Sequence, residues 1–414
     1  MDKWTRKGPV EEGVSMRIER PNYIKALESI LNTKTIKALS GLRCSGKSTL
    51  LRQVRDQLKA SGVPDERIVQ INFEDPGNRW LQDPEALKQT ILERLSPSGK
   101  TCVFLEELQE VPDFPRVLSA LAKREEIDLY LSCSMDEASL KEQLAGLPFT
   151  VLTVEPLSYP EYLQLLAGRE VEQNDAFYQW LTKGGLPYCA GFTDGAWRTY
   201  IDGVYNTILI RDVLQRSKIS DVSLLQALLY ELAVHPAKAV SAAGLAAALS
   251  QSGKKITSKT VDSYLQALCS ASLLQAVSRY DLKSGSVLER NPTYYFGDTG
   301  FLKLIAGEAV DYEGLLKNAV YLELKRRGYT VYAGRLSQEN VDFVAIKGSE
   351  QRYYQVRASI LDEKTREKTF RSLKRIDDNY PKTILSTDLF NFSADGIRHQ
   401  NLTDFFLESQ ESSS

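Results

Sequence analysis

Cysteine and histidine are scarce in this sequence of 414 residues. The five cysteines are widely scattered, with no CxxC pair and no Cys/His cluster: Cys44, Cys102, Cys133, Cys189 and Cys269. The two histidines, His235 and His399, also stand far apart. An odd and dispersed set of cysteines excludes a disulfide scaffold, and it argues against a structural zinc site because zinc needs several such ligands together.

The sequence also lacks long apolar runs and an excess of charge of either sign. No run approaches the ~20 residues of a membrane-spanning helix, and the opening MDKWTRKGPVEEG has no apolar core of a signal peptide. We therefore predict a cytoplasmic protein with no membrane partner. The formal net charge is −2, so global charge argues neither for nor against nucleic acid. Residues 1–15 and 409–414 are predicted to be disordered tails.

The sequence does contain a phosphate-binding signature, GLRCSGKSTLL, at residues 41–51. It fits G-x-x-x-x-G-K-[ST], follows a strand-like run and opens a helical pattern, as a P-loop should. The glycines let backbone N–H groups point at phosphate oxygens, Lys47 reaches the β- and γ-phosphates, and Ser48 holds Mg²⁺. The residues predicted to bind ATP are Gly41, Leu42, Arg43, Cys44, Ser45, Gly46, Lys47, Ser48 and Thr49. A glycine-rich turn without a ligand fits this context poorly.

Strand-like and helical segments alternate from residue 35 to residue 158, which predicts a parallel sheet with helices on both faces. In such α/β sheets ligands bind at the carboxyl ends of the strands. The apolar strand VFLEEL ends in two acids. We predict that Glu106 serves Mg²⁺ and that Glu107 is the base that polarises the attacking water. Ser134, at the end of the next strand, is predicted to touch the γ-phosphate or the water. The alternative is that both acids are surface residues at a strand end.

Residues 166–221 carry apolar residues at helical spacing and are predicted to form a helical lid on this core. In residues 222–305 three helical patterns precede two strand-like runs around a Gly-Ser turn, which predicts a winged helix. In a DNA-reading winged helix the third helix enters the major groove. Its predicted exposed residues are Ser258, Lys259, Asp262, Ser263 and Gln266, preceded by Lys254 and Lys255. One cation and one anion neutralise phosphates poorly, so a packing module is at least as plausible as DNA binding.

Taken together, these residues resemble the prokaryotic AAA-type ATPases that carry a C-terminal domain related to PD-(D/E)xK nucleases. The similarity covers residues 16–407. Besides the P-loop and VFLEELQEVPDFPRVLSAL, it includes RPNYIKAL, INFEDP (71–76), EPLSYPEY (155–162), GGLP (184–187), YYFGDTGFL (294–302), RRGY (326–329), VDF (341–343), YQV (354–356) and DDNYPK (377–382). It implies an AAA-type ATPase domain over 16–165 and a restriction-endonuclease-like α/β domain over 306–408.

Active nucleases of this kind use a helix glutamate, an aspartate and a (D/E/Q)-x-K strand to hold a divalent metal. The resemblance assigns these positions to Lys317, Asp342, Gln355 and Arg357. A lysine at the glutamate position repels a divalent cation, and Arg357 does not deprotonate. Glu323 and Glu339 are other carboxylates that could substitute. We therefore expect a degenerate nuclease fold that is used for binding or regulation.

The resemblance also predicts the rate of hydrolysis. Related proteins often carry an arginine in the segment QLAGLPF where this sequence has Leu147, so we expect slow turnover. Arg43, Arg169 and Arg211 are alternative candidates for an arginine that stabilises the transition state.

The predicted function is therefore that of an ATP- and Mg²⁺-binding AAA-type ATPase. We expect slow hydrolysis that moves a C-terminal winged-helix and nuclease-like module. A metal-dependent DNA-cleaving enzyme and a non-catalytic, ATP-dependent signalling switch are the alternatives. DNA, through either C-terminal domain, and further copies of the chain are left open as partners.

Overall fold

The computed structural model describes residues 18–31, 33–168, 171–189, 192–250, 256–336 and 339–408. The predicted tails, 1–15 and 409–414, lie outside these ranges, and so do Arg169, Lys254 and Lys255. Within the described ranges, no helix is long and apolar enough to cross a membrane.

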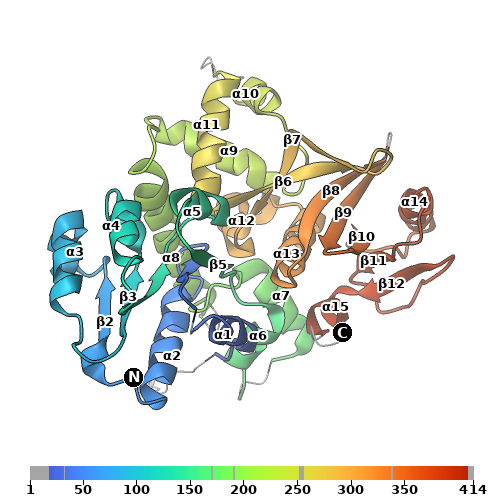
Figure 1. Cartoon of the computed structure of the whole chain (residues 1–414). Helices are drawn as coiled ribbons and strands as arrows, with labels where there is room; N and C mark the ends of the chain where they lie inside the picture. Colours follow the sequence, from blue (N-terminus) through green and yellow to red (C-terminus); the bar gives the residue numbers. More distant parts are fainter. Residues whose placement is uncertain are drawn as a thin grey trace, which may run out of the picture.

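A five-stranded parallel sheet forms the core of the first part of the chain, with the strand order β2-β3-β4-β1-β5 (Figure 1). The strands are β1 (Ile36–Ser40), β2 (Ile68–Asn72), β3 (Thr101–Glu106), β4 (Ile127–Ser132) and β5 (Phe149–Thr153). β1 and β3 are buried along their whole length, as expected for parallel strands covered on both faces. The predicted parallel α/β core is confirmed.

Helices cover both faces of this sheet. They are α1 (Pro21–Glu28), α2 (Lys47–Ala60), α3 (Pro84–Glu93), α4 (Phe114–Leu121) and α5 (Glu137–Gln143). Side chains alternate along a strand, so Ala38 joins one core with α3, α4 and α5. Leu39 joins the other core with α1 and α2. β1 is therefore packed between two layers of helices, and the P-loop follows it directly in the sequence.

The middle of the chain is mainly helical and shares one large core. Its helices are α6 (Tyr159–Leu165), α7 (Gln173–Lys183), α8 (Asp194–Thr207), α9 (Val222–Val234), α10 (Ala242–Ser250), α11 (Ser258–Ser270) and α12 (Thr299–Ala306). Helical spacing is predicted throughout residues 166–221. Within this range α8 passes into a π-helical segment, η4 (Ile208–Leu214). Such wide turns often occur at functional sites.

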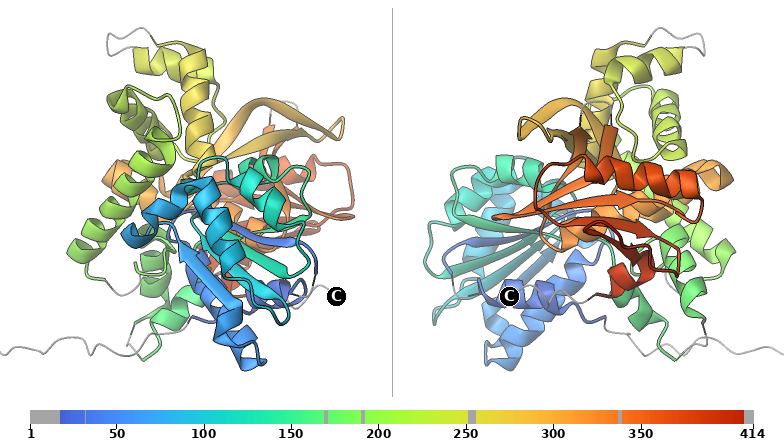
Figure 2. Two further views of the ribbon diagram at one scale, coloured as in Figure 1. Left: turned by 60° about the vertical axis from the view of Figure 1, so that its left-hand side comes forward. Right: turned by 90° about the vertical axis from the view of Figure 1, so that its right-hand side faces the viewer.

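A second, mixed sheet of seven strands has the order β12-β11-β10-β9-β8-β6-β7. In the right-hand view of Figure 2 it is gold to red and lies beside the blue-to-teal core. Its strands are β6 (Leu274–Asp281), β7 (Ser286–Phe296), β8 (Thr330–Leu336), β9 (Glu339–Lys347), β10 (Glu350–Val356), β11 (Lys382–Ser386) and β12 (Ile397–Asn401). Its helices are α13 (Tyr312–Arg326), α14 (Glu363–Lys374) and α15 (Leu402–Leu407). α14 packs in a core with Val344, whereas Phe343 and Ala345 face the core that contains α13.

The β6–β7 hairpin differs from its predicted form in two ways. The sequence pattern predicts the second strand at residues 293–298, whereas β7 starts at Ser286 and runs through Pro292. It lies at the edge of the sheet, where a proline costs no ladder hydrogen bond. β6 also pairs in parallel with β8, so the hairpin and the C-terminal strands form one sheet. The assignments of a helical lid, a winged helix and a nuclease-like domain stay predictions.

Candidate nucleotide-binding site

The loop between β1 and α2 is tightly curled. Gly41 has φ +123°, Cys44 +64° and Gly46 +104°, all in the region that favours glycine. A Cβ on Gly41 would lie 2.6 Å from the carbonyl oxygen of Val154. The loop ends at Lys47, the first residue of α2, where unpaired N–H groups and the helix dipole favour an anion.

Ser45 also belongs to this loop. Its side chain is buried, and its Oγ has no hydrogen-bond partner among the described residues. Burying a hydroxyl without a partner is costly. A ligand oxygen bound in the loop could supply that partner, so the loop fits a phosphate chain. The predicted residues Ser48 and Thr49 follow Lys47 in the first turn of α2.

The Lys47 ammonium is buried and connects the loop to the neighbouring strand ends. It donates hydrogen bonds to the carbonyl oxygens of Leu42 (2.8 Å) and Gly41 (3.1 Å). It also donates to Ser134 Oγ at 3.0 Å and lies 3.8 Å from Glu107 Oε1. The structure thus brings together three residues that the sequence predicts for catalysis and phosphate binding.

Glu106 and Glu107 face different partners. Glu106, the last residue of β3, accepts a hydrogen bond of 2.7 Å from Gln70 on β2. Glu107 turns away through a left-handed backbone conformation with φ +56°, and Gln109 donates to it at 2.7 Å. Burial by itself would raise the pKa of Glu107, but Lys47 and Arg43 hold that pKa below its ordinary value. The carboxylate is therefore ionised at neutral pH.

Arg43 is the centre of a buried ionic network. Its guanidinium donates two hydrogen bonds to Asp212 in η4, at 2.7 and 2.8 Å. It also pairs with Glu74 and lies 3.5 Å from Glu107. Burial by itself would lower the pKa of Arg43, but the hydrogen bonds to Asp212 and the charge of Glu107 raise it. This P-loop side chain is thus tied to the helical part of the chain.

Asp212 did not emerge from the sequence as a site residue. It is an acid inside an apolar helical pattern, ILIRDVL, and a buried acid in such a pattern needs a partner. It also pairs with Arg216 at 2.9 Å, and Arg216 donates to Glu110 at 3.0 Å. Glu74 lies within the motif INFEDP, so this contact accounts for part of that motif.

A second residue that the sequence did not indicate, Arg20, stabilises the P-loop through hydrogen bonds to the backbone. Its guanidinium donates to the carbonyl oxygens of Ser45 (3.1 Å) and Glu155 (2.8 Å) and to Glu161 at 3.0 Å. Glu161 also closes a capping box with Ser158 at the start of α6. The motif EPLSYPEY therefore supports the P-loop through Arg20.

The other arginine candidates lie differently. Arg211 is half-exposed, and its guanidinium lies 3.9 Å from Glu74. Arg169 is outside the described residues. Leu147 is partly buried against the core that contains α3, α4 and α5.

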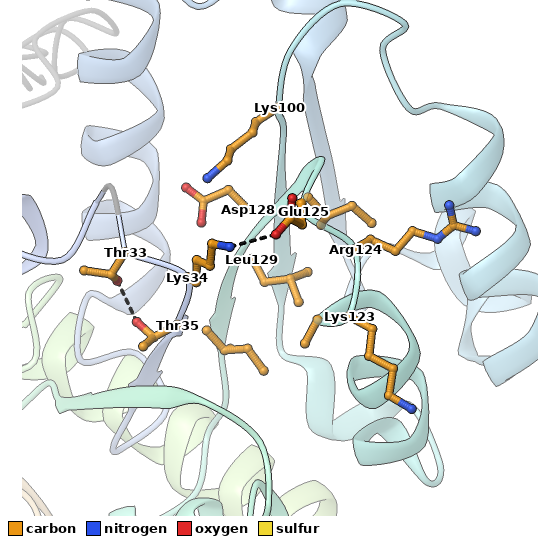
Figure 3. Close-up of a pocket in the computed structure, with 12 residues that line it drawn as sticks. Thr33, Lys34, Thr35, Lys100, Lys123, Arg124, Glu125, Asp128 and Leu129 are labelled. Atoms are coloured by element: carbon orange, nitrogen blue, oxygen red, sulfur yellow. Dashed lines mark hydrogen bonds and ion pairs between the residues drawn. The ribbon is translucent and has the colours of Figure 1, made fainter.

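A small pocket of about 140 Å³ lies at the opposite ends of β1 and β4 (Figure 3). Its lining includes Thr33, Lys34 and Thr35. Lys34 forms an exposed ion pair of 2.7 Å with Glu125. Ligands of parallel α/β sheets bind at the carboxyl ends of the strands. This pocket is at the amino ends, so we do not assign it to a nucleotide.

The predicted nuclease remnant forms a closed cluster of charges. Lys317 Nζ lies 3.0 Å from Asp342 and 3.0 Å from Glu313. Arg357 lies 3.2 Å from Asp342 and 3.3 Å from Glu313. The Gln355 side-chain oxygen accepts a bond of 3.3 Å from the Asp342 backbone N–H. Two fixed cations thus hold two carboxylates.

Glu313 was missed because it lies one helical turn before Lys317, the position that the resemblance indicates. The other carboxylates named from the sequence have different partners: Glu323 bonds Arg327 at 2.8 Å, and Glu339 pairs with Arg375 at 2.5 Å. Among the described residues, no group of three His, Cys, Asp or Glu side chains is arranged to hold a metal ion.

Comparison with known proteins identifies two regions of this chain. Residues 33–163 match the family described as AAA domain. Residues 174–310 match a domain of unknown function, DUF8612. An AAA-type P-loop ATPase domain is therefore confirmed, followed by a domain whose description names no activity.

The chain also has relatives over most of its length. An uncharacterized protein of Haemophilus influenzae is 30% identical over 402 residues, which span 94% of this chain and 99% of the relative. An uncharacterized protein of Methanocaldococcus jannaschii is 21% identical over 404 residues, which span 91% of this chain and 87% of the relative. Among solved structures, a Walker-type ATPase of Pyrococcus abyssi aligns with a TM-score of 0.51 and 16% identity, over 70% of this chain and 96% of that one. This last likeness concerns the fold alone.

Proposed function

This chain belongs to the same protein family as its Haemophilus influenzae relative and carries an AAA-type P-loop ATPase domain, and from that premise we propose that it binds ATP with Mg²⁺ and hydrolyses it slowly. The observation that carries the proposal is the glycine-dependent loop at α2, with the buried Lys47 ammonium beside two carbonyls, a carboxylate and a serine.

In this proposal the P-loop N–H groups and Lys47 hold the phosphates. Ser48 and Glu106 would hold Mg²⁺, with Thr49 next to Ser48 in α2. When bound, the ion neutralises charge on the phosphate oxygens. Lys47 exchanges its hydrogen bonds to Gly41 and Leu42 for bonds to phosphate, which keeps its charge paired.

Glu107 is the base that orients the water, with Ser134 beside the reacting phosphate. Its carboxylate is ionised but held by Gln109, Arg43 and Lys47. A carboxylate with a lowered pKa is a weak base, and it must release one of these partners to reach a water molecule. Slow turnover follows from both properties.

We further propose that the nucleotide state is coupled to the second half of the chain. Three contacts support this coupling. Leu42 packs into the core of the helical region and not into either core of the parallel sheet. Arg43 is bonded to Asp212. The Asp136 N–H donates to the carbonyl oxygen of Ser270, at the end of α11, at 2.9 Å. A shift of the loop on binding phosphate would therefore be transmitted directly.

The parts that respond are assigned as follows in this proposal. Residues 166–221 form a helical lid, α9 to α11 with the β6–β7 hairpin form a winged helix, and 306–408 form a nuclease-like domain without nuclease activity. The predicted exposed residues of α11 (Ser258, Lys259, Asp262, Ser263 and Gln266) all face solvent. The Lys317 and Arg357 cations in the nuclease-like cluster argue against the DNA-cleaving alternative.

Single-turnover hydrolysis of ATP tests the enzymatic part. We expect Glu107→Gln to bind ATP like the wild type and to hydrolyse it about 10²- to 10⁴-fold more slowly. Glu93→Gln, an exposed glutamate on α3, is the matched control and should match the wild-type rate. Equal rates for the wild type and Glu107→Gln would remove Glu107 from catalysis. ATP binding without hydrolysis by the wild type would favour the signalling-switch alternative.

A further inference from the structure

A polar cleft of about 630 Å³ lies where the β6–β7 hairpin joins the C-terminal strands. Its walls come from β6, β7, β8, β9, α13 and the loop between α9 and α10. In Figure 1 the strands β6 to β9 lie right of centre, with α9 and α10 near the top and α13 near the middle. The P-loop contributes no residue to its lining. The cleft is therefore separate from the proposed nucleotide site.

The lining of the cleft is positively charged. Its charged residues are Lys238, Arg279, Lys317 and one acid, Asp342. Asp342 is already neutralised by Lys317 and Arg357, and Glu313 is paired with the same two cations. Two positive charges, on Lys238 and Arg279, thus remain in excess.

Arg279 is the more informative of these two cations. It lies on β6, opposite Ala333 of β8, and it is only half-exposed. Among the described residues, no carboxylate forms an ion pair with it. A guanidinium that is partly removed from water and lacks a counter-charge is suited to bind an anion, and its fork of N–H groups fits a phosphate.

The cleft also extends across several strands of the sheet. Arg279 on β6 and the neutral ion-pair cluster around Asp342 on β9 lie two strand spacings apart, which is about 10 Å. Neutral hydrogen-bonding residues line the cleft between and around them: Ser241, Asn291, Thr293 and Asn340. A polar groove of this length with two excess cations suits a chain of phosphates better than a single phosphate.

We propose that this cleft binds the phosphodiester backbone of DNA without cleaving it. Two fixed cations, Lys317 and Arg357, stand at the carboxylates where a divalent ion would have to bind. They neutralise these carboxylates and cannot activate water as a metal does. The inference does not depend on ATP hydrolysis.

Fluorescence anisotropy with labelled short DNA, duplex and single-stranded, tests this site in the full-length protein. We expect Arg279→Glu and Lys238→Glu each to weaken binding about tenfold and to reduce the slope of log affinity against log salt by about one. Arg198→Glu, an exposed arginine on α8 outside the cleft, is the matched control and should bind like the wild type. Unchanged ATP affinity and thermal unfolding would show that each variant is folded.

Three results would overturn the proposal. The first is DNA binding that Arg279→Glu leaves unchanged or reduces no more than Arg198→Glu does. The second is a competition experiment in which polyglutamate displaces labelled DNA from the protein as well as unlabelled DNA does. This result would mean that the cleft recognises carboxylates as well as phosphodiesters. The third is Arg279-dependent binding of inorganic phosphate with no binding of either DNA, which would identify a small-anion site. Cleavage of the DNA in the presence of Mg²⁺ or Mn²⁺ would refute the non-cleaving part.

Discussion

Removing the Asp212 carboxylate should destabilise the whole nucleotide-binding region. The Arg43 side chain is 4% exposed and that of Asp212 is 0% exposed, and two hydrogen bonds of 2.7 and 2.8 Å join them. Deleting one partner of a buried ion pair costs about 3–5 kcal/mol. Glu74 and Glu107 remain near Arg43 after the change. We therefore expect Asp212→Ala to lower the free energy of unfolding by about 3 kcal/mol, the lower end of that range.

Urea unfolding followed by tryptophan fluorescence measures this effect, because Trp180 and Trp197 are buried in α7 and α8, and α8 continues into η4. Asp202→Ala, an exposed aspartate on α8, is the matched control and should change stability by less than about 0.5 kcal/mol. The double variant Arg43→Met/Asp212→Ala removes both charges and closes a cycle with Arg43→Met and Asp212→Ala. It should be more stable than the sum of the two single changes predicts, by about 2 kcal/mol.

A coupling energy near zero in this cycle would refute the reasoning. It would mean that Arg43 and Asp212 are each held by other partners, so the contact could not transmit the nucleotide state. A loss below about 1 kcal/mol for Asp212→Ala would contradict the buried-pair estimate in the same way.

The other predictions concern the P-loop and a buried histidine. Gly41→Ala should abolish ATP binding and lower the free energy of unfolding by about 1–3 kcal/mol, because its Cβ would lie 2.6 Å from the Val154 carbonyl oxygen. The control is Gly62→Ala, at φ +95° with nothing within 4 Å of the new Cβ, which should keep full ATP affinity. Calorimetric titration with ATP distinguishes the two variants. Burial lowers the pKa of His399, whose Nδ1 accepts a hydrogen bond of 3.2 Å from Phe392 N–H. Because the unfolded chain then binds a proton more readily than the folded chain, stability should be full above about pH 6.5 and fall as the pH drops below it; His399→Asn should lose this dependence, and urea midpoints at about pH 7.5 and pH 5.5 would show it.

The parts of the site that the sequence predicts are those marked by local sequence patterns, namely the P-loop and the ends of the apolar strands. The P-loop, its strand and its helix lie within one short segment, and strand ends in a parallel sheet meet at one edge. That is why Lys47, Glu107 and Ser134 could be predicted to lie together, as they do.

The parts that the sequence did not predict depend on long-range packing. Asp212 is 169 residues from Arg43, and no local pattern links them. Glu313 differs from the expected Lys317 by one helical turn, which periodicity alone does not resolve because both lie on the same face of α13. The pairing of β6 with β8 likewise depends on how two regions dock, which alternation within a strand does not encode.

Calorimetric titration of the full-length protein with ATP and Mg²⁺, for the wild type and Lys47→Ala, tests the central claim most directly. A charge-assisted hydrogen bond contributes about 1.5–3 kcal/mol, so Lys47→Ala should bind ATP about tenfold or more weakly than the wild type. Equal affinities, or no measurable binding by folded wild-type protein, would contradict the account.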